Sequence, residues 1–460
     1  MTVPAHADLD PPRPGRTRAQ RYRAGKALRQ KAPRSGQGRW APASDRPDVL
    51  DLLALADRGR IRRLVPIRYG RMSLSPGAFL RGAANVMAFD LASTSTTGLK
   101  VQLAGDAHLS NFGVFATPER DRVFDVNDFD ETLPGPWEWD LKRLATSLVV
   151  ASRLNRFSPG NGRRAALRAM RTYRRAMHRY TAATYLDGWY SRIDLSTLGE
   201  EVAAEGRRVA RKAIRRARRR TGLYAFPRIV ERVRGDYRIR DDPPLISHQP
   251  GEYDARSIAA VLRAYRETLT VDRRLLLDRY TVADVAQKVV GVGSVGTSCW
   301  VVLLLGDADV GDPLFLQLKE ATRSALEPYL GASPYANHAE RVVVGQHLIQ
   351  EASDIFLGWG RGRSRDFYLR QLRDMKFSSE VATFGPKAMA GQAELCGAAL
   401  ARSHARTGDA AAISGYLGEG DGFDRAIAAF AERYADQTER DHRTLRRAIR
   451  AGRIAAEVDV

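Results

Sequence analysis

Acidic and amide residues gather in two short stretches, each just after a segment with the apolar pattern of a strand. The first runs Gly-Asp-Ala-His-Leu-Ser-Asn from Gly105 to Asn111, and the second runs Asn-Asp-Phe-Asp from Asn127 to Asp130. Phosphoryl transfer needs a residue that orients the attacking hydroxyl and oxygen ligands that hold Mg²⁺ against the phosphates. The two stretches therefore predict such a site, with Asp106 as the catalytic residue and with Asn111, Asp128 and Asp130 as metal ligands.

The spacing Asp-x-x-x-x-Asn from Asp106 to Asn111 is that of the catalytic loop in kinase-like enzymes. In that pattern Asp128 takes the position of the aspartate that bridges metal and phosphates. His108 is expected to brace the loop, because the neighbouring carboxylate already fills the catalytic role. Asp140 is expected to cap backbone amides of the loop or of its own helix.

A glycine-rich segment with the form G-x-G-x-x-G occurs much later, in Gly-Val-Gly-Ser-Val-Gly from Gly291 to Gly296. A dinucleotide-binding loop of this form opens a helix. Residues 297–305 instead have the apolar, β-branched composition of a strand. This favours a β-hairpin lid over the phosphates of ATP, contacted by Gly291, Gly293, Ser294 and Gly296.

The next predicted strand, residues 314–320, carries Lys319 near its end. A phosphate-binding lysine is expected at this place in a kinase-like small lobe. The carboxylate partner of that lysine is expected on the following helix, with Glu340 as the first choice and Glu351 as the second. Lys319 and Glu340 thus complete the predicted nucleotide site.

The surrounding patterns predict an α+β protein in four segments. Residues 1–45 are rich in Pro, Gly, Arg and Lys and are expected to form a disordered basic arm. Residues 46–280 are expected to form a helical large lobe with the catalytic and metal-binding loops, and residues 281–376 a small β-rich nucleotide-binding lobe. Residues 377–460 are expected to be helices that complete the large lobe. Since the catalytic loop precedes the glycine loop, this kinase-like two-lobe fold is expected to be circularly permuted.

The composition is that of a globular chain, with 44% hydrophobic and 28% charged residues. No apolar run reaches the roughly 18 residues of a membrane span. The N-terminus lacks the pattern of a secretory signal, so a cytoplasmic location is expected. Cys299 and Cys396 have no spacing typical of a metal or redox site. The net charge of +21 indicates either attraction to a polyanion or a general bias toward arginine.

Longer phrases of the sequence resemble known families. The run from Gly105 to Asn111, with Asp140-Leu141 further on, resembles the aminoglycoside and choline phosphotransferases. Most of the chain from about Gly25 resembles a bacterial family, domain of unknown function 2252 (DUF2252). That resemblance implies the protein-kinase-like superfamily and supplies no established substrate. It rests on the catalytic segment and on residues 65–72, 79–84, 317–321, 341–343, 370–376 and 434–437.

Three functional hypotheses follow. The first is an ATP- and Mg²⁺-dependent phosphotransferase that acts on an unknown small molecule or protein. The second is transfer of AMP by the same fold with the nucleotide reversed. The third is a non-catalytic scaffold, either a pseudokinase or a nucleic-acid binder that uses the basic arm and the arginine-rich residues 206–220. Nucleic-acid binding is not favoured, because no aromatic residues interleave with these arginines to stack on bases.

Overall fold

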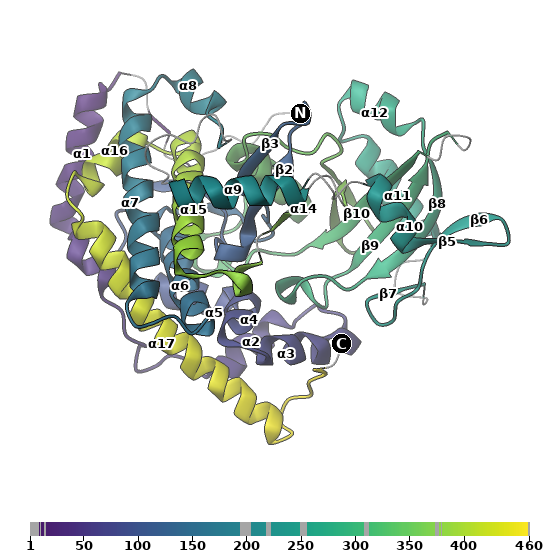
Figure 1. The fold of residues 1–460 in the computed structure, drawn as a ribbon, viewed down its shortest axis with the longest axis horizontal. Helices are drawn as coiled ribbons and strands as arrows, with labels where there is room; N and C mark the ends of the chain where they lie inside the picture. Colours follow the sequence, from purple (N-terminus) through teal and green to yellow (C-terminus); the bar gives the residue numbers. More distant parts are fainter. Residues whose placement is uncertain are drawn as a thin grey trace.

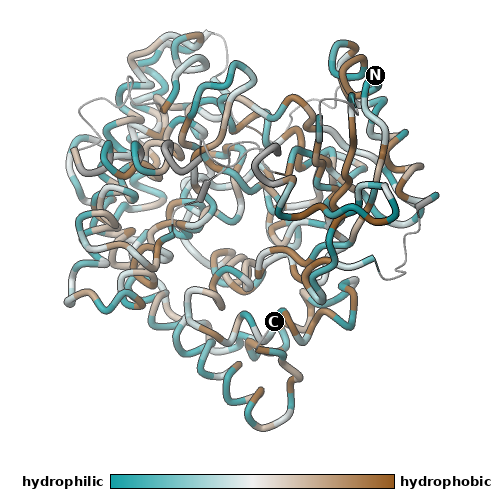
Figure 2. Tube along the Cα trace, turned by 45° about the vertical axis from the view of Figure 1, so that its right-hand side comes forward, coloured by the Kyte–Doolittle hydropathy of each residue, from teal (hydrophilic) through white to brown (hydrophobic). Residues whose placement is uncertain are grey.

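The computed structural model describes residues 9, 11–12, 15–193, 204–217, 222–248, 255–307, 312–372, 377–378 and 380–458. It is a mixed α+β fold with a mainly helical part and a part built on a sheet, which lie side by side in Figure 1. Figure 2 shows apolar stretches along the strands and central helices, with hydrophilic residues on many outer turns. The α+β prediction is confirmed.

Four long helices form the centre of the helical part: α6 (Glu138–Leu154), α7 (Asn161–Ala182), α15 (Pro386–Thr407) and α17 (Gly422–Arg450). In α7, buried Ala, Met and Tyr residues recur at helical spacing while arginines take the exposed positions between them. Gly397 of α15 lies so close to α7 that an added Cβ would come within 2.2 Å of the Ala169 carbonyl oxygen. α15 therefore packs directly against the backbone of α7, which also contacts α6.

Shorter helices complete this part: α2 (Val49–Ala56), α3 (Val65–Ser73), α4 (Pro76–Gly82), α5 (Ala84–Ala92), α8 (Tyr185–Tyr190), α9 (Ala204–Ala217), α13 (Glu327–Leu330) and α16 (Ala410–Leu417). The apolar spacing of residues 76–91 is that of one helix, but the chain breaks at Ala83 into α4 and α5. Arg68 donates to the Gly82 carbonyl oxygen at 2.8 Å at this break.

The predicted disordered arm is wrong where the structure describes it. Residues Arg18–Lys31 form α1, which packs on α16 through Gly25, whose added Cβ would lie 1.8 Å from the Ala412 carbonyl oxygen. Arg21 forms an ion pair with Asp409 at 2.6 Å. Few large apolar residues take part, among them Leu28, which packs against the main core, so the sequence pattern of the segment does not reveal that it docks. Residues 1–8, 10 and 13–14 of the predicted arm lie outside the described residues.

The second part is a six-stranded antiparallel sheet in the order β11-β12-β10-β9-β8-β7. Its strands are β7 (Ile246–Ser247), β8 (Thr281–Lys288), β9 (Cys299–Leu305), β10 (Pro313–Ala321), β11 (Gly358–Arg361) and β12 (Asp366–Gln371). Strands β8 to β12 lie within residues 281–376, where a β-rich segment was predicted, whereas β7 lies before that segment. Helix α14 (His338–Ile349) contacts β10, β11 and β12.

Residues expected to be helical in the large lobe also belong to the sheet part. They form α10 (Gly222–Ile229), the hairpin β5 (Val230–Val233) with β6 (Asp236–Ile239), β7, α11 (Ala255–Arg266) and α12 (Val271–Leu277). Ile258, Val261 and Tyr265 of α11 share a buried core with Trp300 and Val302 of β9. The change from the helical part to the sheet part therefore comes before residue 280.

Two small sheets carry the acidic loops. Strand β1 (Lys100–Leu103) pairs with β4 (Leu133–Pro136), and β2 (Phe112–Ala116) pairs with β3 (Arg122–Val126) and with β13 (Phe377–Ser378). The Asn127 amide donates to the Asn111 carbonyl oxygen at 3.0 Å, just beyond the paired ends of β2 and β3. This bond joins the first acidic loop to the second.

Candidate active site

A cavity of about 750 Å³ lies between the helical part and the sheet. It is the place where the predicted site residues meet, although they come from distant parts of the chain. Its size is within the roughly 300–1,000 Å³ typical of small-ligand sites. The predicted residues that line it are Asp106, His108, Asn111, Asp128, Asp130, Gly291, Gly293, Ser294 and Lys319.

The loop predicted to be catalytic, residues 105–111, is supported by side chains of the helical part. Asp106 accepts hydrogen bonds from Arg143 of α6, with 2.7 Å between Arg143 Nε and Asp106 Oδ1. Arg143 is itself buried, and it also donates to the Leu80 carbonyl oxygen at 2.6 Å. Asn111 donates its Nδ2 to the Asp106 carbonyl oxygen at 2.8 Å, which leaves Oδ1 as the amide atom that can bind a cation. The loop therefore holds both side chains in fixed orientations.

Two further residues support this loop. Asp140 accepts hydrogen bonds from the Ala104 and Gly105 amides at 2.7 and 3.0 Å, a capping arrangement like the one expected for it. His108 is 4% exposed, and its Nε2 lies 3.6 Å from Asp106 Oδ2. Burial lowers the pKa of His108 to about 4, so the imidazole is neutral near pH 7. A neutral, buried imidazole fits a bracing role better than that of a proton carrier.

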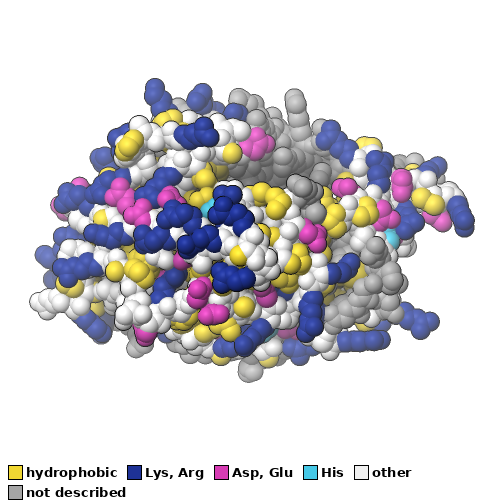
Figure 3. Space-filling view, turned by 90° about the horizontal axis from the view of Figure 1, so that it is seen from below, with side chains coloured by type: hydrophobic (Ala, Val, Ile, Leu, Met, Phe, Trp, Pro, Cys, Tyr) yellow, Lys and Arg dark blue, Asp and Glu magenta, His cyan; other side chains and the backbone are white. Residues whose placement is uncertain are grey.

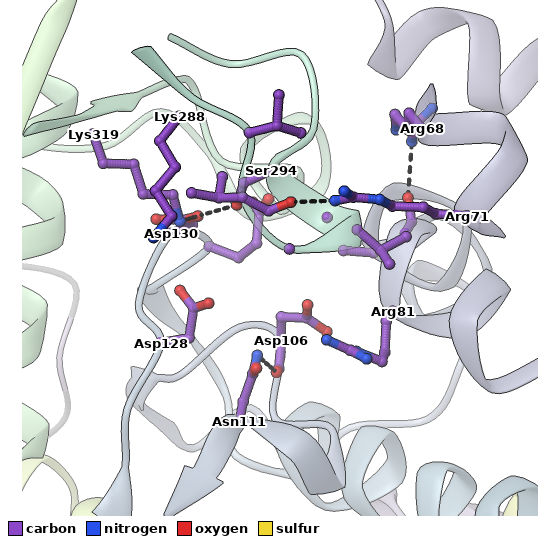
Figure 4. A pocket seen from close by; sticks show the side chains of 18 of the residues that line it. Arg68, Arg71, Arg81, Asp106, Asn111, Asp128, Asp130, Lys288, Ser294 and Lys319 are labelled. Atoms are coloured by element: carbon purple, nitrogen blue, oxygen red, sulfur yellow. Dashed lines mark hydrogen bonds and ion pairs between the residues drawn. The ribbon is translucent and has the colours of Figure 1, made fainter. Parts of the chain in front are cut away.

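The second acidic loop divides its carboxylates between two environments. Asp128 faces the cavity together with Asp106 and Asn111 (Figure 4). Asp130 instead receives donors on both oxygens: Lys319 and Ser294 on Oδ2, and Tyr368 on Oδ1 at 2.8 Å. Since donors already occupy both oxygens, Asp130 is poorly placed for the metal-ligand role predicted for it.

Lys319 lies on β10 within the cavity, and its ammonium group pairs with Asp130. Burial opposes the charge on this lysine, but the Asp130 carboxylate, followed by Tyr368, raises its pKa well above the usual value. Glu340, expected as the partner, lies in the first turn of α14 and does not line the cavity. Glu351, the second choice, forms an ion pair with Arg192 at 3.1 Å. The carboxylate partner thus comes from the catalytic segment and not from the helix after the lysine strand.

The glycine-rich segment joins β8 to β9, which pair antiparallel, so the local prediction of a β-hairpin is confirmed over the dinucleotide-binding alternative. Its middle forms a single 3-10 turn at Val292–Ser294. Arg71 donates to the Val290 carbonyl oxygen at 2.7 Å and Arg60 donates to the Gly293 carbonyl oxygen at 3.0 Å. Gly296 does not line the cavity; its φ of +93° forms the turn beside Arg60. The loop is therefore anchored from the helical part.

Several residues that line the cavity or contact its lining residues were not predicted. Arg143 follows Asp140 by three residues on α6, so helical spacing could have suggested that it faces the same loop. Tyr368 and Arg370 lie two residues apart on β12 and therefore on the same face of the strand. No sequence motif identifies them. In Figure 4, Arg68 and Arg71 of α3 and Arg81 of α4 lie across the cavity from Lys319. Arg60, in the turn before α3, also lines the cavity, and these four residues are called the arginine wall below.

The described residues contain no cluster of three or more His, Cys, Asp or Glu side chains arranged to hold a metal ion. A Mg²⁺ site needs fewer protein ligands, because this ion commonly binds one or two carboxylates, water and substrate phosphates. Asn111 and Asp128 supply suitable oxygen donors on one side of the cavity (Figure 4). The donor set thus fits a metal ion that is bound together with a phosphate ligand.

The described part of the arginine-rich segment, residues 206–217, belongs to α9 and does not line the cavity. Val209 and Ala213 on the described part of α9 are buried, and α9 contacts α15. Residues 218–220 lie outside the described part of the chain. Figure 3 shows Lys and Arg side chains spread over one face of the molecule among acidic and apolar ones.

The fold and site define an α+β protein with a polar cavity, which is lined by two acidic loops and a glycine-rich hairpin. The chain belongs to the DUF2252 family, whose description is "Uncharacterized protein conserved in bacteria"; the match covers residues 60–448. No curated protein and no solved structure matches the chain. Among the described residues, no helix combines the length and apolar character needed to cross a membrane.

Proposed function

We propose that this protein is a kinase-like, Mg²⁺-dependent phosphotransferase that takes its phosphoryl group from ATP. The observation that carries the proposal is the meeting of Asp106, Asn111, Asp128, Lys319 and the glycine hairpin around one cavity. Each short motif occurs by chance in many chains. Their convergence from different elements into one space is not expected by chance.

The order of elements supports a circularly permuted two-lobe kinase-like fold. A glycine-rich hairpin, β8–β9, is followed by the lysine strand β10 and then by helix α14, as in the small lobe of a kinase. The acidic loop, a β-hairpin and Asp128 also follow one another as in a kinase large lobe, but they come first in the chain. The departure is Asp130, which takes the place of the usual glutamate as the partner of Lys319.

In this proposal Lys319 and the backbone of the glycine hairpin bind the nucleotide phosphates, and Asn111 and Asp128 hold the metal. A bound Mg²⁺ neutralises charge that develops on the phosphates during transfer. Asp106, fixed by Arg143, orients the acceptor hydroxyl and receives its proton as the new oxygen–phosphorus bond forms. The bond between the terminal phosphorus and its bridging oxygen breaks, and ADP leaves with that electron pair.

The test is nucleotide binding by calorimetry with and without Mg²⁺. We expect wild type to bind ATP only weakly without the metal, and Asp128→Ala to lose the Mg²⁺-dependent gain in affinity. Asp121→Ala is a matched control, since Asp121 lies on the β2–β3 turn with its side chain 63% exposed. Absence of ATP binding by wild type, or an unchanged Mg²⁺ effect in Asp128→Ala, would overturn the proposal.

A further inference from the structure

The arginine wall has far less negative charge around it than the opposite side of the cavity. Among the described residues, the only ion-pair partner of its four arginines is Asp57, which lies 2.8 Å from Arg68 and 3.9 Å from Arg60. Arg71 donates to a backbone carbonyl oxygen, and Arg81 makes no hydrogen bond or ion pair with any residue that the structure describes. In the described part of the chain, Asp57 is thus the one carboxylate within ion-pair distance of the wall, although Glu131 and Glu320 also act on Arg60.

The arginines of the wall differ in burial: Arg60 and Arg68 are largely desolvated, whereas Arg81 is exposed. The side chains of Arg60 and Arg68 are 15% and 0% exposed. Burial, and then the charge of Arg68, lowers the pKa of Arg60 to about 10, and burial also lowers the pKa of Arg71. Arg71 has no carboxylate within ion-pair distance among the described residues, so an anion that binds to it would offset the cost of its burial.

The position of the wall indicates which ligand supplies that anion. Figure 4 shows Arg81 directed toward Asp106 and Arg71 directed toward the glycine hairpin, while Lys319 and Asp128 lie on the other side of the gap. The proposed nucleotide site already contains the cations Lys319 and Arg370. An oxyanion bound by Arg71 and Arg81 would therefore lie beside the residue that orients the acceptor.

We propose that the acceptor carries an anionic group, a phosphate or a carboxylate, which Arg71 and Arg81 bind so that an acceptor hydroxyl lies next to Asp106. Planar guanidinium groups suit such oxyanions because they can donate two parallel hydrogen bonds. This inference rests on the proposed phosphotransferase function and narrows it to anionic acceptors. The same chemistry has a second source, the phosphates of the nucleotide itself, which the experiment separates.

The experiment measures inorganic phosphate binding by calorimetry, on wild type alone and on wild type saturated with Mg²⁺ and a non-hydrolysable ATP analogue. We expect phosphate to bind the nucleotide-loaded protein. In Arg81→Gln we expect binding of phosphate to weaken about tenfold, since one charge-assisted contact is lost. The nucleotide affinity should stay within about twofold of wild type, because Arg81 lies on the opposite wall.

The control is Arg58→Gln, which removes the same charge from an exposed arginine that does not line the cavity. It should bind phosphate as wild type does. Phosphate that binds only the nucleotide-free protein would assign the wall to the nucleotide and overturn the inference while leaving the phosphotransferase standing. Unchanged phosphate binding in Arg81→Gln would do the same. Failure of wild type to bind the nucleotide would instead remove the proposed function, and the acceptor assignment with it.

Discussion

The two sides of the cavity differ in how their charges are compensated. The lysine side, consisting of Lys319, Arg370, Asp128 and Asp130, brings cations and carboxylates together within the protein. Among the residues that the structure describes, the four arginines of the wall have one carboxylate, that of Asp57, within ion-pair distance. A compensated side keeps its geometry without a ligand, whereas an uncompensated side gains most from one. The difference suggests that the lysine side is preorganised and that the arginine wall selects its ligand by charge.

The strongest test of this contrast removes the cation from the compensated side. Lys319→Met leaves the Asp130 carboxylate without its buried partner, and loss of one member of such a pair costs about 3–5 kcal/mol. Urea unfolding should show that loss, and calorimetry should show loss of nucleotide binding. The double variant Lys319→Met/Asp130→Asn should recover much of the stability but not the binding.

An exposed ion pair gives the control for this prediction. Arg425→Met breaks a contact with Asp421 whose side chains are 61% and 54% exposed, so its effect should stay below about 1 kcal/mol. If Lys319→Met were as stable as Arg425→Met, the lysine side would not be preorganised by its internal pair.

The next prediction concerns the charge of His108, in the loop between the two sides. It tests whether the imidazole of this residue is neutral in the folded protein. Its folded-state pKa of about 4 lies below the ordinary value of 6.5, so the unfolded chain binds more protons between these two pH values. The free energy of unfolding should therefore fall as pH decreases from about 6.5 to about 4, by about 3 kcal/mol from this residue. That contribution is fully present above the unfolded pKa.

The measurement compares urea unfolding of wild type and His108→Asn across that pH range. The variant should start lower because packing is altered, and the two curves should converge as the pH falls. Parallel curves would show that His108 is already protonated, or accessible to water, in the folded protein. In that case the loop would add positive charge beside the arginine wall.

Much of the site could be predicted because its motifs are local. The spacing from Asp106 to Asn111, the strand that leads to Asp128 and the hairpin after the glycines each depend on a few consecutive residues. Local patterns of this kind decide turns and strand ends. The sheet strands were found for the same reason, since continuous apolar runs such as residues 299–305 mark buried strands.

What could not be predicted depends on contacts between distant segments. Nothing near Lys319 in the chain indicates that its partner is Asp130, because the pairing arises only when the sheet docks on the acidic loops. The docking of α1 through Gly25 likewise depends on a contact with a distant segment of the chain, at Ala412. The arginine wall comes from α3, α4 and the turn before them, where its residues look like ordinary exposed arginines of a basic chain. Charge compensation is a property of the assembled cavity, which no short sequence window contains.

Arg60 gives the smallest expected effect, and it tests whether the two sides are independent. This arginine belongs to the arginine wall, yet it donates to the carbonyl oxygens of Gly293 and Ala56, at 3.0 and 2.8 Å, and so links the glycine hairpin to the helical part. Arg60→Ala should weaken nucleotide binding about tenfold through a less ordered hairpin. Arg58→Ala, two residues away and exposed, should leave that affinity unchanged.

Arg60→Lys separates the two roles, because lysine keeps the charge but cannot reproduce the planar, forked donor geometry of arginine. We expect nucleotide binding in Arg60→Lys to resemble that in Arg60→Ala, while phosphate binding to the loaded protein stays near wild type. Recovery of nucleotide binding by lysine would show that Arg60 acts through its charge. The positive charge of the arginine wall would then also contribute to nucleotide binding. In that case the two sides of the cavity would not be independent.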